Sequence, residues 1–280
     1  MGSRIAARLL GAGVPVRAWN RDPRRAEPIA ALGAEVSESP EAAVAGCDFV
    51  VMMLADGPAT RAVLWERGAG AAMAPGTIVA DMASIPAADA REHARRLAER
   101  GVAYLDAPVS GGSRGAQEGS LTIMVGGDRA AHDRAAPIFA PLGRTTHIGP
   151  SGAGQVAKSA NQLIVGITIG AVAEALVLAE AAGADAAAVR EALMGGFADS
   201  RILREHGERM LTGDFAPGAK VATQLKDLRT VLTLAAEVGI SLPLAERITD
   251  LFARLQDTIG AELDHSSLIL ALRTPADGLP

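Results

Sequence analysis

Short apolar runs and helix-like stretches alternate along the first half of the chain. Six runs, mostly rich in β-branched residues, predict strands over residues 14–19, 47–54, 77–82, 103–107, 121–125 and 145–148. Helical patterns lie between several of them, over residues 23–32, 58–66, 87–100 and 130–139. Strands joined by helices of this length indicate βαβ units, and therefore a largely parallel, doubly wound sheet.

The strand pattern stops after residue 148. A turn-rich break over residues 149–154 precedes about thirty residues without proline, which predict one long helix. Further helices are predicted over residues 186–194, 200–211, 220–238 and 244–259, and the third of them has one packed face formed by Val221, Leu225, Leu228, Leu232 and Ala235. The pattern therefore predicts an α/β domain over residues 1–150 and an all-α domain over residues 151–280, joined through the long helix. Residues 274–280 are expected to form a loose tail.

Charge and cysteine content narrow the functional classes. The net charge of −5 leaves no basic face for phosphates, which argues against a nucleic-acid partner. A single cysteine, Cys47, cannot form an internal disulfide, so a reducing compartment and a cytoplasmic location are expected. The N-terminus has no signal-peptide pattern.

Two further classes are disfavoured by residue placement. The most apolar stretch, residues 163–178, is interrupted by Glu174 and falls short of the roughly 20 apolar residues of a membrane span. We therefore expect a buried helix and no membrane partner. The five histidines are scattered without a close pair, so no metal site is expected.

The N-terminal residues resemble the end of a dinucleotide-binding fingerprint. A helical pattern over residues 3–10 is followed by a turn at residues 11–13. Such a fingerprint needs a preceding strand and two earlier glycines, and only Gly2 is present to match its last glycine. Because a parallel sheet without that strand would have open edges in its middle, we expect that the reading frame begins upstream and that this domain is truncated.

The end of the strand over residues 14–19 is the position where a ribose is read. NAD is recognised there by an acidic residue, whereas arginines suit the 2′-phosphate of NADP. This chain has Asn20 and Arg21, with Arg24 and Arg25 close behind, which favours NADP over NAD. The alternative interpretation is a solvated helix start, since exposed arginines are common.

The segment over residues 106–112 (DAPVSGG) follows a predicted strand, at the edge where open α/β sheets bind ligands. Ser110, Gly111 and Gly112 offer a hydroxyl and backbone N–H groups suited to a carboxylate. An ordinary glycine-rich loop is the alternative.

A second polar segment opens the long helix. In helical conformation Lys158, Asn161 and Gln162 lie at positions i, i+3 and i+4 and share a face. Burying such a cluster is costly without partners, and lysine is usually exposed. The apolar neighbours, Val156 and residues 163–165, favour a lined cleft instead.

Together these segments resemble the β-hydroxyacid dehydrogenase family, from residue 1 to about residue 273. The matching pieces fall in the family order: Met1-Gly2, Asn20-Arg21, Asp81-Met82-Ala83-Ser84, residues 106–112 with Gly115-Ala116, residues 121–127, residues 152–162, Lys226-Asp227-Leu228, and Asp264 with Ser266. The resemblance implies a Rossmann-type domain followed by a helical domain. It also implies hydride transfer between NADP or NAD and a small 3-hydroxy or 3-oxo carboxylic acid.

The resemblance also implies a role for each matching position. Lys158 looks like the catalytic lysine, which protonates the substrate oxygen in reduction and acts as base in reverse. Ser110, Gly111 and Gly112 look like the substrate-carboxylate site, and Asn161 and Gln162 like substrate-orienting residues. The cofactor-binding positions implied are Gly2, Asn20, Arg21, Leu54, Ser84 and Lys226.

Residues 161–162, 226 and 264–266 look closest to the 2-hydroxy-3-oxopropionate reductases, with 3-hydroxyisobutyrate as the other candidate substrate. An imine reductase is one alternative, but Lys158 counts against it because the lysine is typically replaced in that group. A non-catalytic dinucleotide-binding scaffold is the other; the missing nucleotide loop favours it, and the presence of Lys158, Ser110 and Asn161 argues against it. The long apolar helix predicts a homodimer or homotetramer.

Overall fold

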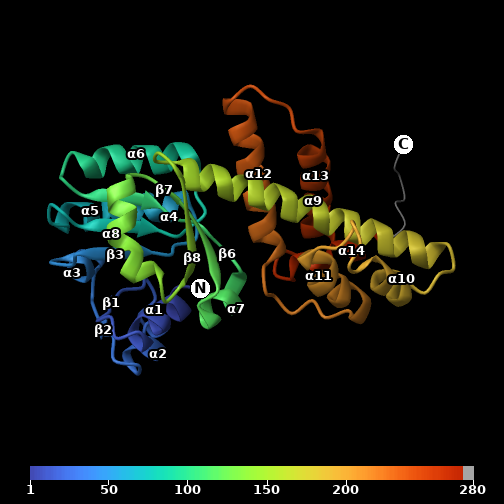
Figure 1. The fold of residues 1–280 in the computed structure, drawn as a ribbon, viewed down its shortest axis with the longest axis horizontal. Coiled ribbons are helices and arrows are strands. Elements are labelled where there is room, and N and C mark those ends of the chain that lie inside the picture. The colour runs from blue at the N-terminus through green and yellow to red at the C-terminus, as the bar shows by residue number, and fades with distance from the viewer. Residues whose placement is uncertain (274–280) are drawn as a thin grey trace. The chain divides into compact units, whose positions relative to one another are not determined.

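The chain forms two compact units, residues 1–158 and residues 159–280 (Figure 1). The computed structural model describes residues 1–273, so the predicted tail over residues 274–280 lies outside the described part.

The first unit contains two sheets. β1 (Arg17–Ala18) pairs in parallel with β2 (Glu35–Val36) and forms a sheet of two strands. The larger sheet has six strands in the order β3-β4-β5-β7-β6, with β8 paired to β7. Their bounds are β3 (Phe49–Met52), β4 (Ile78–Asp81), β5 (Ala103–Asp106), β6 (Val109–Ser110), β7 (Leu121–Gly126) and β8 (Gly143–Gly149).

The Rossmann-type fold predicted from the sequence is confirmed, with one difference in strand direction. β3, β4 and β5 are parallel, as are β7 and β8, but β7 runs antiparallel to both β5 and β6. Every predicted strand is present, mostly shorter than expected. β2 and β6 were missed because two residues are too few to show a period of two.

Helices surround these strands in the first unit. They are α1 (Gly2–Gly11), α2 (Glu27–Ala30), α3 (Pro40–Val44), α4 (Gly57–Arg61), α5 (Ala69–Ala72), α6 (Ala87–Ala98), α7 (Gly112–Glu118) and α8 (Arg129–Phe139). A 3₁₀ turn (Pro23–Arg25) precedes α2, and a π-helical turn (Ala62–Glu66) follows α4. The single helix predicted over residues 23–32 is broken because Pro28 has no N–H to continue the first turn. Ile78, Leu105, Ile123 and Phe139 are fully buried in the sheet core.

Over its described residues, 159–273, the second unit is built from helices, with one isolated β-bridge between Lys220 and Asp264. α9 (Ala153–Ala181) begins in the first unit and continues into the second, followed by α10 (Ala186–Leu193), α11 (Arg201–Thr212), α12 (Val221–Glu237), α13 (Pro243–Thr258), a 3₁₀ turn (His265–Ser267) and α14 (Leu268–Arg273). The face predicted for α12 is buried at Val221, Leu225, Leu228 and Ala235, whereas Leu232 is half-buried. Ile169 of α9 packs with Val221, Leu225 and Leu228 in one core.

α9 has 29 residues, as the proline-free run predicts, and it extends beyond the apolar stretch over residues 163–178 on both sides. Its 29 residues are long and apolar enough to cross a membrane by length and composition alone, so the expectation that this stretch falls short is wrong. This is weak evidence for a membrane span, because the core helix of a soluble protein passes the same test. Ile169, Ala173 and Leu176 of α9 lie fully inside the helical core.

Candidate active site

The parallel strands bring several predicted residues to one edge of the larger sheet. Met52, Asp81 and Asp106 are aligned in register at the carboxyl ends of β3, β4 and β5. Leu54 follows β3 and Ser84 follows β4, and both side chains are half-buried. Ligands of open α/β sheets bind beyond this edge, so these two positions suit a cofactor.

The predicted ribose position follows β1. Asn20 and Arg21 are exposed, and Asn20 Oδ1 accepts a hydrogen bond from the N–H of Asp22 at 3.0 Å. Arg24 donates two hydrogen bonds to the Asp22 carboxylate, at 2.9 and 3.1 Å, and lowers the pKa of that carboxyl. Arg24 is therefore committed to Asp22, which leaves Arg21 as the better candidate for a phosphate.

Gly2 lies in the first turn of α1 and is half-buried. A Cβ added there would lie 3.7 Å from Cβ of Met53, an ordinary van der Waals distance. The packing of the protein itself does not require glycine at this position.

The serine–glycine segment joins β6 to α7. Ser110 pairs with Thr122 of β7 and is half-buried. Gly111 and Gly112 adopt φ angles of +126° and +62°, which L-residues with side chains rarely adopt. The glycines are thus required by the turn, and the same turn leaves the backbone at Gly112 exposed.

Asp106 anchors the beginning of α9 to the end of β5. Its Oδ1 accepts a hydrogen bond from the N–H of Gly152 at 2.7 Å, and its Oδ2 accepts one from the N–H of Gln155 at 2.9 Å. Burial raises the pKa of Asp106, and these N–H groups oppose the shift. A Cβ on Gly154 would lie 2.4 Å from the Asp106 carbonyl oxygen, so the helix and the strand are in backbone contact.

Gln155 makes a second connection in the same turn. Its Oε1 accepts a hydrogen bond from the N–H of Ile85 at 3.2 Å, and its Nε2 donates one to the carbonyl oxygen of Ala83 at 2.8 Å. The side chain is buried, so both ends of the amide are held on either side of Ser84. Sequence reasoning gave no role to Gln155.

Asp81 is a fully buried acid at the end of β4. Its carboxylate accepts hydrogen bonds from the Tyr104 hydroxyl at 2.7 Å and from the N–H of Ala83 at 3.0 Å. The pKa of Asp81 is raised to about 6, chiefly by burial and in smaller part by the nearby charge of Asp106, although these hydrogen bonds oppose the rise. Through its hydrogen bond with Ala83, this acid holds the turn that precedes Ser84.

Lys158 lies three residues after Gln155 on α9. Its side chain is buried, with 9% of its surface exposed, so the interpretation of a solvated lysine is wrong. Asn161 and Gln162 are half-buried further along the helix.

A polar network in the second unit connects its three predicted residues. Asn161 Nδ2 donates to Gln162 Oε1 at 2.9 Å, Gln162 Nε2 donates to Asp227 Oδ2 at 2.6 Å, and Lys226 Nζ lies 3.0 Å from Asp227 Oδ1. Gln224 Nε2 also donates to the Gln162 carbonyl oxygen at 3.2 Å. Asp227 and Gln224 are buried. The sequence placed Asp227 in the matching segment Lys226-Asp227-Leu228 without giving it a role, and it gave no signal for Gln224.

The expectation that no two histidines lie close together is wrong. His206 and His265, on α11 and the 3₁₀ turn, have their Nε2 atoms 3.2 Å apart, and Asp264 lies beside them. The Asp264 oxygens accept hydrogen bonds from Gly218 N–H at 2.9 Å and Ser266 Oγ at 2.7 Å, and one lies 2.8 Å from Arg209. Because protein donors already occupy this carboxylate, we interpret the cluster as a structural contact that joins α11, residue 218 and the 3₁₀ turn.

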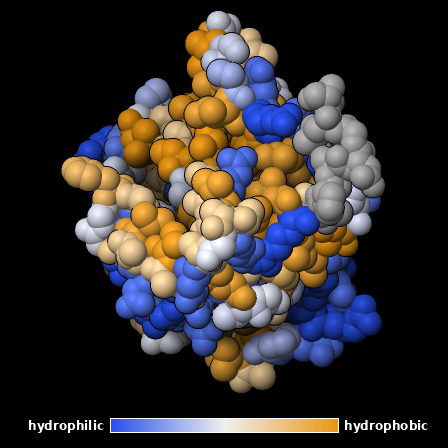
Figure 2. Space-filling model, turned by 90° about the vertical axis from the view of Figure 1, so that its right-hand side faces the viewer, coloured by the Kyte–Doolittle hydropathy of each residue, from blue (hydrophilic) through white to orange (hydrophobic). Residues whose placement is uncertain are grey.

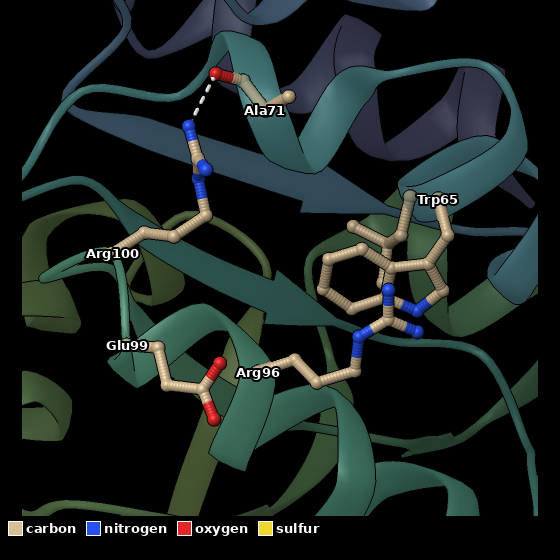
Figure 3. Close-up of a pocket in the computed structure, with 6 residues that line it drawn as sticks. Trp65, Ala71, Arg96, Glu99 and Arg100 are labelled. Carbon is tan, nitrogen blue, oxygen red and sulfur yellow. Dashed lines mark hydrogen bonds between the residues drawn. The ribbon is translucent and has the colours of Figure 1, made fainter.

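A shallow pocket lies on the first unit near α5 and α6, away from the predicted residues (Figure 3). The Arg96 guanidinium lies over the Trp65 ring, 3.7 Å from its centre, while Arg100 turns away and donates to the Ala71 carbonyl oxygen at 2.9 Å. No residue predicted to bind substrate or cofactor lines this pocket.

Two family models match the chain, one to each half. Residues 1–149 match the NAD-binding domain of 6-phosphogluconate dehydrogenase, and residues 152–272 match the NAD-binding domain of NADP-dependent 3-hydroxyisobutyrate dehydrogenase.

Curated relatives are similar over nearly their whole lengths. The chain is 43% identical over 279 residues to 2-hydroxy-3-oxopropionate reductase of Escherichia coli K12, covering 99% of this chain and 95% of the relative. It is 36% identical over 287 residues to a probable 3-hydroxyisobutyrate dehydrogenase of Mycobacterium tuberculosis, covering 99% and 96%.

Solved structures show the same likeness. The structure of Mycobacterium tuberculosis 3-hydroxyisobutyrate dehydrogenase with L-serine superposes with a TM-score of 0.91 at 34% identity, covering 98% of this chain and 96% of that one. An imine reductase of Streptomyces aurantiacus superposes with a TM-score of 0.63 at 27% identity, covering 97% and 96%.

Proposed function

Since the chain belongs to the β-hydroxyacid dehydrogenase family, we propose that this NAD(P)-dependent oxidoreductase reduces 2-hydroxy-3-oxopropionate with NADPH. The family acts by transferring a hydride between the nicotinamide and a small 3-hydroxy or 3-oxo carboxylic acid. The observation that carries the proposal is the buried side chain of Lys158. Lys158 follows Gln155 by one helical turn, and Gln155 is hydrogen-bonded to the backbone on both sides of Ser84. The 43% identity to a 2-hydroxy-3-oxopropionate reductase supports the choice of substrate.

Lys158 is proposed as the proton donor. A lysine ammonium can give a proton to the carbonyl oxygen of the substrate. A reduced nicotinamide, held by the residues of the first unit named below, would supply the hydride for this reduction. The C=O group thereby becomes CH–OH, and Lys158 is left neutral until it takes a proton from solvent. In the reverse direction the neutral amine removes the hydroxyl proton.

The remaining polar residues are proposed to bind and orient. Ser110 and the N–H groups of Gly111 and Gly112 would hold the substrate carboxylate. Asn161 and Gln162 would orient the substrate through their amides. Their orientation is supported by Asp227, which accepts a hydrogen bond from Gln162 and pairs with Lys226.

The residues that suit the dinucleotide lie in the first unit, with Lys226 added from the second. Leu54 and Ser84 would line it at the sheet edge, and Gly2 would allow close approach of the pyrophosphate. Asn20 and Arg21 would recognise the ribose and its 2′-phosphate. Functionally, we assign residues 1–150 to NAD(P) binding and residues 151–280 to substrate binding and assembly.

Steady-state assays test the activity and the role of Lys158. Loss of NADPH absorbance would be followed with tartronate semialdehyde (2-hydroxy-3-oxopropionate), methylmalonate semialdehyde and succinate semialdehyde. Lys158→Ala is expected to lower kcat by about 10²–10⁴-fold, the usual contribution of a general acid, with NADPH binding retained. Turnover near the wild-type value in that variant would refute the role. NADPH binding without turnover of any acid by the wild type would instead favour the non-catalytic scaffold.

The cofactor preference has its own test. Arg21→Ala is expected to raise KM for NADPH by about tenfold, because a charge-assisted hydrogen bond to phosphate contributes about 1.5–3 kcal/mol. KM for NADH should stay unchanged, since NADH has no 2′-phosphate. An equal change for both cofactors would remove Arg21 from phosphate recognition.

We also propose that the protein is a cytoplasmic homodimer or homotetramer that associates through the helical unit. Large apolar side chains are exposed there at Ile164, Leu178, Val238, Ile240 and Leu244. Figure 2 shows apolar residues gathered over one face of the molecule. Exposed apolar area of this kind marks association surfaces in soluble proteins. Light scattering after size exclusion tests it; a monomer at micromolar concentration would contradict it.

A further inference from the structure

The turn before Ser84 and the first turn of α9 are joined by one buried side chain. Gln155 is 1% exposed, and its amide accepts from the N–H of Ile85 and donates to the carbonyl oxygen of Ala83. Each of these backbone groups belongs to a residue adjacent to Ser84, and Ala83 and Ile85 are themselves buried. A primary amide is the side chain that satisfies both at once, because it carries a donor and an acceptor in one plane.

The same turn of α9 is fixed from a second direction. Asp106 accepts hydrogen bonds from the N–H groups of Gly152 and Gln155, and Gly154 packs directly against the Asp106 backbone. Asp106 therefore sets where α9 begins. Gln155 then connects that beginning to the segment after β4, so the two residues constrain the turn by different contacts.

We propose that Gln155 is a positioning residue for the reduction: its side-chain amide fixes Ser84, on the cofactor edge of the sheet, relative to Lys158, the proton donor. The inference rests on the proposed function, and it adds a residue that contacts neither substrate nor cofactor in that scheme.

The geometry gives the reason for the coupling. Lys158 follows Gln155 by three residues on a continuous helix, so the two residues lie about one turn apart and move together. Hydride and proton must reach the same carbonyl group, and a misplacement of about 1 Å between reacting groups can lower a rate by about 10²-fold. A clamp that ties the cofactor-side turn to the lysine-bearing helix prevents that misplacement.

The decisive experiment compares two substitutions at Gln155 with a matched control. Gln155→Leu keeps the shape and removes both hydrogen bonds. Gln155→Glu keeps the acceptor for Ile85 but can donate to Ala83 only while its carboxyl is protonated. The control is Thr77→Val, which removes a buried hydrogen bond of 2.9 Å to the Cys47 carbonyl oxygen elsewhere in the same unit.

Gln155→Leu is expected to lower kcat about 10- to 100-fold, while the Kd for NADPH changes less than about threefold. Gln155→Leu and Thr77→Val should lower Tm by similar amounts, because each loses buried hydrogen bonds. Thr77→Val should nevertheless leave kcat within about twofold of the wild type. For Gln155→Glu, the ratio of its kcat to the wild-type kcat should rise as the pH is lowered from about 8 to about 6, because protonation restores the donor. A purely structural role would give no such rescue.

Amide hydrogen exchange supplies a readout that does not depend on turnover. In Gln155→Leu and not in Thr77→Val, exchange at Ile85 should become faster, because its N–H loses its acceptor. The proposal is overturned if kcat of Gln155→Leu stays within about twofold of that of Thr77→Val, if the glutamate variant shows no rescue, or if exchange at Ile85 is unchanged. A wild-type protein that reduces none of the semialdehydes would overturn the proposed function instead, and the positioning role would fall with it even where Ile85 exchange confirms the clamp.

Discussion

Replacing Asp81 with asparagine is expected to stabilise the first unit at neutral pH, by an amount that shrinks as the pH falls. Asp81 is fully buried at the end of β4. Burial raises the pKa of its carboxyl to about 6 in the folded protein, against 3.8 in the unfolded chain, although Tyr104 and Ala83 donate hydrogen bonds to it. Asparagine has nearly the same shape, can accept from Ala83 and donate to Tyr104, and carries no charge.

The magnitude follows from the two pKa values. A rise of about two units corresponds to about 3 kcal/mol of unfavourable free energy for the ionised form in the folded state. Because the folded pKa is the higher one, the carboxyl contributes full stability below about pH 4 and loses it as the pH rises through about 6. Between pH 7 and pH 5 the wild type should therefore gain about 1 kcal/mol relative to Asp81→Asn.

Urea unfolding at several pH values, followed by tryptophan fluorescence, measures this difference. Both tryptophans of the chain, Trp19 and Trp65, lie in the first unit, so the signal reports that unit. Asp48→Asn, which makes the same substitution at an exposed position of the same unit, serves as the control. The reasoning is refuted if Asp81→Asn changes stability by the same amount at pH 5 and at pH 8.

Two further substitutions probe other buried groups. Burial would raise the pKa of Asp264, but hydrogen bonds from Ala219 and Ser266 lower it to about 2. Asp264→Ala should cost about 3–5 kcal/mol, because Arg209 loses its ion pair with a buried carboxylate and the N–H groups of Gly218 and Ala219 lose their acceptor; an unchanged Tm in thermal unfolding would contradict this. The Nδ1 of His93 accepts a hydrogen bond from Trp65 at 3.1 Å, and burial lowers the pKa of His93 below its unfolded value of 6.5. The folded protein is therefore most stable above about pH 6.5, where the imidazole is neutral, and it loses stability as the pH falls below that value. In His93→Gln the free energy of unfolding should therefore decrease less between about pH 7 and pH 5 than in the wild type. Urea titrations at several pH values that give the same dependence on pH as the wild type would argue against this.

The sequence predicted those features that local patterning controls. Each predicted strand and the long helix α9 carry several periods of apolar residues, and all are present. The two-residue strands β2 and β6 carry no period, and the helix predicted over residues 23–32 is interrupted at Ala26, two residues before Pro28. The antiparallel direction of β7 depends on the connection from β6 through α7, which composition alone does not specify.

The sequence predicted which residues could form the site, but not which residues contact them. Lys158 was recognised as one of three polar residues on an apolar helix, and its burial agrees with that interpretation. The partners of Gln155 lie 70 and 72 residues away in the chain, and His265 is 59 residues from His206. Pairings at such separations depend on tertiary packing, so no spacing in one sequence reveals them.

The close approach at Gly154 bears on how substitution data for this region should be interpreted. A Cβ there would lie 2.4 and 2.5 Å from two backbone oxygens, of Asp106 and Met124, so no other residue fits without moving a strand. In the proposed mechanism Lys158, only four positions later, is required for proton transfer and not for packing. In a saturation scan scored for abundance and turnover separately, intolerance at Gly154 would appear as lost protein and intolerance at Lys158 as lost catalysis. Two neighbouring positions that admit a single residue can thus be constrained by unrelated causes, and invariance alone would not distinguish them.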